Sequence, residues 1–160
     1  MKEASKPSNY QTLTMYDGYG VPIPHAKHWC NNILKAFYDA KHPVSYETVR
    51  EQIWRDMGLT QEQIDCQTRT RVHRGVDVMA DTAITMLIIM GLLKEAGEGL
   101  SNHCINPETF APAKVYFYEI TQEGIKIIET GQAIDDDFVA KLVSVHPGEL
   151  KFKNLLFFWN

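Results

Sequence analysis

The chain has 160 residues, of which 44% are hydrophobic and 22% charged, and this composition excludes a disordered or fibrous protein. Sixteen Lys and Arg residues against twenty Asp and Glu residues give a net charge of −4. That balance excludes a generally basic nucleic-acid coat but leaves room for a local basic surface. No apolar run reaches the roughly eighteen residues of a membrane-spanning helix. The polar N-terminus lacks an apolar signal segment, so we expect a cytoplasmic protein.

Three widely spaced cysteines, Cys30, Cys66 and Cys104, predict reduced thiols in that compartment. His28 and His103 could join two of them in a zinc site. No C-x-x-C or H-x-x-x-H spacing is present to support such a site. We therefore expect neither a metal nor a cofactor.

The N-terminal third is predicted to be an irregular arm followed by two helices. Residues 1–25 are polar and rich in Pro and Gly, which indicates an arm. Apolar residues at helical spacing predict a first helix over 26–40, which ends before Pro43 because proline disfavours helix at the preceding residue. A second helix is predicted over 46–57, with the Ser45 hydroxyl as its N-terminal cap.

A short helix and a long apolar helix follow. Thr60 and Gln63 form a capping-box pattern that predicts one helical turn at 61–66. Apolar residues then recur every three or four positions over 72–90, and Gly91 closes the pattern. The second half of this third long helix is apolar nearly all round, so we expect it to be buried.

Two strand patterns come next, over 92–95 and 114–120, and the second is rich in aromatic and β-branched residues. The Gly- and Pro-containing stretch 96–113 between them predicts an unusually long hairpin loop. Thr121 then caps a predicted helix over 122–130.

The C-terminal segment is predicted to be a helix followed by an apolar tail. Asp135-Asp136-Asp137 marks the start of the helix. The tail is too apolar to remain in water, so it either folds back on the core or contacts a second copy or another protein. The residues of this predicted oligomer or partner contact are Leu155, Leu156, Phe157, Phe158 and Trp159.

The order of elements predicts a mainly α fold with a small β-hairpin, arranged as a winged helix-turn-helix. The predicted winged-helix domain spans 26–131, between the N-terminal arm 1–25 and a C-terminal helix and tail over 132–160.

Three short motifs extend this interpretation. Met90-Gly91-Leu92-Leu93-Lys94 and Tyr118-Glu119-Ile120-Thr121-Gln122-Glu123-Gly124 are typical of winged-helix domains, in which they open and close the wing. Together with Met57-Gly58-Leu59-Thr60-Gln61-Glu62-Gln63, they resemble the N-terminal winged-helix domain of Mrr-type restriction endonucleases over about residues 28–131. That resemblance implies DNA binding. The family's nuclease half is missing, and Glu149-Leu150-Lys151 lacks the surrounding residues of a nuclease metal site, so we expect no enzymatic activity.

A basic cluster lies at the entry to the third long helix, where helix-turn-helix proteins contact DNA. We expect Arg69 and Arg71 to hold phosphate, and His73 or Arg74 to face the bases. Lys114, at the base of the wing, could reach a further phosphate. The complete predicted set is Gln67, Thr68, Arg69, Thr70, Arg71, His73, Arg74 and Lys114.

Two carboxylates on the same helix favour a different interpretation. Asp77 and Asp81 continue the exposed face beyond Arg74, and Asp77 lies at the spacing of a solvated ion pair with it. The hypotheses are therefore a small transcriptional regulator that binds duplex DNA, with a homodimer preferred, or a winged-helix protein-interaction module. The second could be a subunit or an inhibitor in a restriction or phage-defence system.

Overall fold

The computed structural model describes residues 15–17, 21–66 and 74–160. These residues are mainly helical, as predicted, and the predicted β-hairpin is part of a three-stranded antiparallel sheet. The predicted arm contains a further pair of short strands, β1 and β2. The elements are β1 (Met15–Asp17), β2 (Pro22–Pro24), the 3-10 helix η2 (Ala26–Trp29), α2 (Cys30–Ala40), β3 (Val44–Ser45), α3 (Tyr46–Met57), α4 (Gln61–Asp65), α5 (Gly75–Ile89), β4 (Leu93–Ile105), β5 (Pro112–Ile120), α6 (Gln122–Thr130), α7 (Asp136–Ser144) and α8 (Leu150–Trp159).

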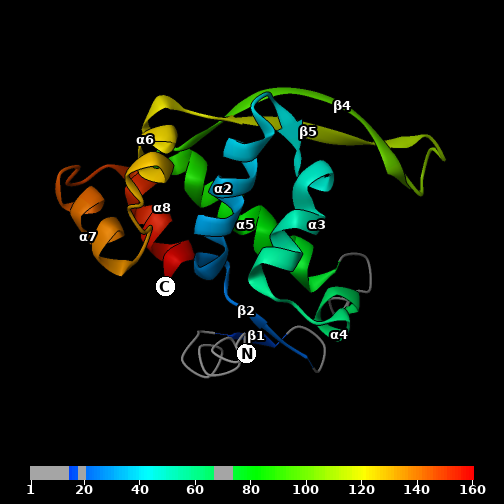
Figure 1. Cartoon of the computed structure of the whole chain (residues 1–160), viewed down its shortest axis with the longest axis horizontal. Helices are drawn as coiled ribbons and strands as arrows, with labels where there is room; N and C mark the ends of the chain where they lie inside the picture. Colours follow the sequence, from blue (N-terminus) through cyan, green and yellow to red (C-terminus); the bar gives the residue numbers. More distant parts are fainter. Residues whose placement is uncertain (1–14, 18–20, 67–73) are drawn as a thin grey trace.

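The strands form two separate antiparallel groups. β1 pairs with β2, while β3, β5 and β4 form a three-stranded sheet in that order. The long β4–β5 hairpin arches over α2 and α3, and the β1–β2 pair lies at the opposite side of the molecule (Figure 1). The C-terminal helices α7 and α8 lie together beside α6 (Figure 1).

Helix α5 is the centre of the core. It contacts η2, α2, α4, α8 and β4. Its buried side chains occur on several sides of the helix, because its sequence is apolar nearly all round. The fully or almost fully buried residues of α5 are Gly75, Val76, Met79, Ala80, Ala83, Ile84, Met86 and Leu87.

The glycine and threonine of the two wing motifs meet where α5, β4 and α6 join. The Thr121 hydroxyl donates to the Gly91 carbonyl at 2.6 Å and accepts from the Gly124 amide at 3.1 Å. The Thr121 amide donates to the Leu92 carbonyl at 3.1 Å. Gly124 packs so closely on this junction that a Cβ there would lie 2.6 Å from Ile120 Cγ1 and would clash with the Leu92 carbonyl oxygen.

Gly124→Ala is therefore expected to destabilise the protein, although alanine is the better helix former. Overpacking of this kind costs about 1–3 kcal/mol in the free energy of unfolding. Urea denaturation measures the loss, with Gln122→Ala at an exposed position of the same helix as control. Equal midpoints for the two variants would show that the junction tolerates a side chain.

The structure differs from the prediction in the division of the first helix and in the N-terminal cap of α3. The predicted first helix over 26–40 divides into η2 and α2. Ser45 holds the N-cap position of α3, but its side chain makes no capping hydrogen bond. The Ser45 hydroxyl pairs instead with the Thr48 hydroxyl at 3.1 Å. The Thr60–Gln63 capping box of α4 is confirmed, with both reciprocal hydrogen bonds present.

The predicted long loop over 96–113 is wrong. β4 continues to Ile105, with register irregularities between Glu95 and Glu98 and between Leu100 and Ile105. The extended strand pairs with β5 through residues 98–100 and Ile105. Between them, Glu47 of α3 accepts hydrogen bonds from the Ser101 hydroxyl at 2.8 Å and the Asn102 amide at 3.3 Å. This contact holds the irregular part of the strand against α3.

Both ends of the described chain pack on the core. Ile23 of β2, within the predicted arm, is fully buried, and the Trp29 indole donates to the Pro24 carbonyl at 2.9 Å. In the tail, Leu155 and Trp159 are buried. The Trp159 indole donates to Asp136 Oδ1 at 2.8 Å, which fastens α8 to α7.

The tail contact also predicts a pH dependence. The hydrogen bond from Trp159 and the charge of Lys27 lower the pKa of Asp136 from its usual 3.8. A carboxylate with a lowered folded-state pKa stabilises the native state above its unfolded pKa and loses that contribution as the pH falls through the folded value. Asp136→Asn should therefore lower the melting temperature at neutral pH, and the difference from the parent should shrink below about pH 3.8.

Asp137→Asn is the matched control, because Asp137 lies in the same first turn of α7. It removes the same charge near the helix N-terminus while the indole contact remains. A pH-independent difference between the Asp136→Asn variant and the parent would contradict this assignment.

Candidate nucleic-acid interface

Six residues of the predicted DNA-binding set lie outside the described residues. They are Gln67, Thr68, Arg69, Thr70, Arg71 and His73. The described residues on either side of them come together, because the Gly75 amide donates to the Cys66 carbonyl at 2.9 Å. The predicted start of the third long helix at 72 is also outside the description, and α5 begins at Gly75 with Arg74 as its N-cap.

Arg74 lies against an aromatic side chain of α3 and shares it with a second arginine. The guanidinium carbon of Arg74 is 5.7 Å from the centroid of the Trp54 ring, and that of Arg50 is 5.3 Å from it. Such cation–π contacts position a guanidinium without removing its charge. Among the described residues Arg74 forms no ion pair with Asp77, the partner that the sequence spacing allows.

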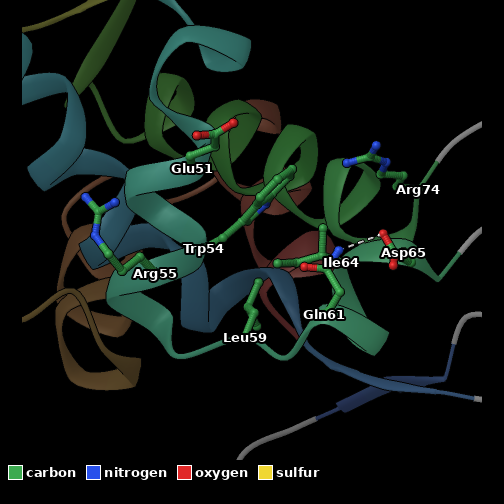
Figure 2. A pocket seen from close by; sticks show the side chains of 8 residues that line it. All are labelled: Glu51, Trp54, Arg55, Leu59, Gln61, Ile64, Asp65 and Arg74. Carbon is green, nitrogen blue, oxygen red and sulfur yellow. Dashed lines mark hydrogen bonds between the residues drawn. The ribbon is translucent and has the colours of Figure 1, made fainter.

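Arg74 and Trp54 line a groove of about 450 Å³ between α3, α4 and the start of α5. Figure 2 shows the Trp54 ring between α3 and α5, with Arg74 on one side and Leu59 and Ile64 below it. The charged side chains that line the groove are Glu51, Arg55, Asp65 and Arg74. Arg50 on the same tryptophan adds a further positive charge to this surface. We call Arg50, Trp54 and Arg74 the arginine–tryptophan cluster.

A hydrogen-bond network fixes the tryptophan of this cluster. The Trp54 indole donates to the Tyr46 hydroxyl at 3.2 Å, and that hydroxyl donates to Asp77 Oδ1 at 3.0 Å. Burial, with the Asp77 carboxylate beside it, raises the pKa of Tyr46, so the tyrosine stays protonated as a donor. Asp77 also places a negative charge in the first turn of α5. That charge offsets the positive end of the helix dipole, which makes the helix terminus less suited to phosphate than the sequence suggests.

Tyr46→Phe should destabilise the protein, because it leaves the buried Trp54 indole and the Asp77 carboxylate without this partner. A lost buried hydrogen-bond partner costs about 1–3 kcal/mol in the free energy of unfolding. Urea denaturation measures it against Tyr38→Phe, which removes an exposed hydrogen bond to Glu129. A loss no larger than that of the control would show that the network does not hold Trp54.

Lys114 lies on the exposed surface of the hairpin, on β5. Its Nζ is 3.4 Å from Glu98 Oε1 across the two strands. Both side chains are more than half exposed, so this pair is weak. It nevertheless reduces the local positive charge that the sequence assigns to the base of the wing.

The predicted partner contact is divided by the fold. Leu155 and Trp159 are buried within the chain, so they are not available to a partner, and this part of the prediction is wrong. Leu156 is half-buried. Phe157 and Phe158 remain exposed at 79% and 36% and contact each other edge to face. The helical spacing explains the division, since one face of α8 packs on α5.

The remaining candidate groups are the cysteines and the Glu149-Leu150-Lys151 segment. Cys30 is buried, which raises the pKa of its thiol, whereas Cys104 is exposed on β4. In the described part of the chain, no group of three or more His, Cys, Asp or Glu side chains could hold a metal ion. Glu149 pairs with His146 at 2.8 Å, and Lys151 Nζ lies over the Phe152 ring at 5.1 Å.

The predicted DNA-binding set does not include Arg50 and Trp54. Their spacing of four on the predicted second helix could have identified them as neighbours on one face. What the spacing did not show is that Arg74, from another helix, shares the same ring.

No protein-family model matches the chain, and no curated protein or solved structure matches it. Over the residues that the structure describes, none of the helices has the length and apolar character needed to cross a membrane.

Proposed function

We propose that this chain is a winged-helix module that binds duplex DNA through the surface around the arginine–tryptophan cluster. The observation that carries the proposal is the position of Arg50 and Arg74 on one tryptophan, where α3 meets the start of α5. This is the part of a helix-turn-helix unit that approaches DNA. We expect the two arginines to contact mainly the phosphate backbone, because phosphate contacts fix the orientation of a protein on the duplex.

The order of the elements supports the winged-helix assignment. α2, β3, α3, α5, β4 and β5 follow one another along the chain, with α4 in the connection between α3 and α5. In the three-stranded sheet, β3 pairs with β5, so that the strand order is β3-β5-β4. A helix-turn-helix followed by a hairpin has this organisation.

The chemistry of the cluster supports a phosphate contact. A guanidinium presents several N–H donors in one plane and can bind a phosphate through two of them. Trp54 is 8% exposed and held by Tyr46, so it gives both arginines a rigid support. Ordering a long side chain before binding reduces the entropy that binding must overcome. Arg69 and Arg71, which precede Arg74 in the sequence, lie outside the described residues and remain predicted phosphate contacts.

The direct test is a titration of fluorescently labelled duplex DNA at several salt concentrations. Each lost phosphate contact lowers the slope of log affinity against log salt by about one, so Arg50→Gln/Arg74→Gln should lower it by about two. Arg50→Lys/Arg74→Lys keeps the charges, so it should keep most of the slope and lose part of the affinity.

Lys126→Gln/Lys153→Gln is the charge-matched control, because it also removes two positive charges and both lysines are exposed, on α6 and α8. It should bind DNA like the parent. Circular dichroism melting of each variant separates lost binding from lost folding. Unchanged affinity and slope in the folded Arg50→Gln/Arg74→Gln variant would reject the proposed interface.

A protein-interaction module is the second candidate. One observation favours it: the part of α5 that reaches the surface carries Asp77 and Asp81, and Asp81 is exposed. Carboxylates on this face would repel a DNA backbone if α5 entered the major groove along its length. This acidic face suits a positively charged partner instead.

A further inference from the structure

A second groove lies on the other half of α5, away from the arginine–tryptophan cluster. It has a volume of about 520 Å³ and is lined by α5, by the β4–β5 hairpin and by the end of α8. It shares no lining residue with the groove of Trp54 and Arg74, and along α5 Asp81, its lining residue nearest to Arg74 in the sequence, is about 10 Å from Arg74, at 1.5 Å per residue. The groove is therefore a separate surface from the proposed DNA contact.

Three aromatic rings and two carboxylates meet in this groove. They are Tyr116, Tyr118, Phe158, Asp81 and Glu95. The strand register brings three of them together, because Glu95 pairs with Tyr118, and Tyr116 lies two residues before Tyr118 on the same face of β5. Asp81 comes from α5, and the exposed ring of Phe158 comes from α8.

The groove is both apolar and negatively charged. Ile84, Ile88 and Ile89 of α5 contribute aliphatic surface. Among the described lining residues, the charged side chains are the carboxylates of Asp81 and Glu95, with no Lys or Arg. Burial first, and then these two carboxylates, raise the pKa of Tyr118, so its ring remains neutral and keeps the π face that attracts cations.

The position of Phe158 is set by the core. The neighbouring Trp159 is 3% exposed and its indole is hydrogen-bonded to Asp136. Phe157 packs edge to face on Phe158 with ring centroids 5.6 Å apart. The ring of Phe158 contacts Phe157 and remains 36% exposed, and Tyr116 in the same groove is 48% exposed.

We propose that this groove binds a segment of a partner protein that presents an arginine or lysine side chain among apolar side chains. The cation would lie against the Tyr116 and Phe158 rings and near the Asp81 and Glu95 carboxylates, while the apolar neighbours would cover Ile88 and Ile89. Charge complementarity selects this occupant, because the same carboxylates repel nucleic-acid phosphates. Aromatic rings beside carboxylates are a favourable environment for a partly desolvated guanidinium or ammonium group.

The test uses the full chain and a short synthetic helical peptide that carries arginine and leucine side chains on the same face. A matched peptide carries citrulline, which is uncharged, in place of every arginine. Calorimetry should show that the arginine peptide binds more tightly than the citrulline peptide. Asp81→Asn/Glu95→Gln should weaken the arginine peptide about tenfold and leave the citrulline peptide unchanged.

Phe158→Ala should weaken both peptides, because it removes apolar surface that both use. Glu108→Gln/Glu123→Gln is the charge-matched control and should bind like the parent, because it also removes two exposed carboxylates, one at the tip of the hairpin and one on α6. Both carboxylates of the double variant are exposed, so that variant is expected to fold, and circular dichroism verifies it.

Three results would overturn the proposal. They are equal affinities of the two peptides for the parent, an equal loss in the Glu108→Gln/Glu123→Gln variant, or a concentration-dependent dimer of the peptide-free protein that Phe158→Ala abolishes. The last result would assign the groove to a second copy of the chain. None of these depends on DNA binding, so the two proposals fail separately.

Discussion

The burial of α5 is the constraint on which the rest of the structure depends. A helix that is apolar nearly all round has to be covered on most of its sides. In this chain η2, α2, α8 and β4 supply the cover. The tail joins the core for the same reason, since Leu155 and Trp159 of α8 are buried there. Little of α5 is then left at the surface, and any binding role has to use its two ends or the narrow acidic strip between them.

The two ends of α5 have different chemistry. At its start, Arg74 and Arg50 share the Trp54 ring, and the sequence adds Arg69 and Arg71 just before it. Along its second half, Ile84, Ile88 and Ile89 line a groove that also contains Asp81, Glu95 and three aromatic rings. A protein with a net charge of −4 can bind an anion only where its positive charges are concentrated. The arrangement is consistent with a module that holds DNA at one end of the helix and a cationic protein segment at the other.

Local patterns in the sequence predicted the parts of the fold that depend on neighbouring residues. The capping box of Thr60 and Gln63 is present as predicted, and the two wing motifs meet through Thr121, Gly91 and Gly124. Features that depend on distant residues were not predictable in this way. The segment after residue 95, expected to be a loop, is a strand paired with β5, and Glu47, far away in sequence, binds Ser101 in it. The tail was left with two possible fates, since an apolar sequence does not distinguish burial within one chain from burial between chains.

The candidate site was predictable to a similar extent. Its location at the entry to the third long helix follows from the arginines and from the helix order, but the tryptophan that supports Arg74 comes from another helix. The Tyr46–Asp77 hydrogen bond also links two helices. It changes the electrostatics of the α5 terminus in a way that sequence spacing does not reveal.

Nuclear magnetic resonance of the indole N–H groups during a titration with duplex DNA tests most directly whether DNA binds at the arginine–tryptophan cluster. The three tryptophans give separate signals, because Trp29, Trp54 and Trp159 donate to a carbonyl, a hydroxyl and a carboxylate, respectively. If DNA binds at the arginine–tryptophan cluster, the Trp54 signal shifts while those of Trp29 and Trp159 keep their positions. A titration that leaves Trp54 unmoved, or that moves Trp159 instead, would contradict it.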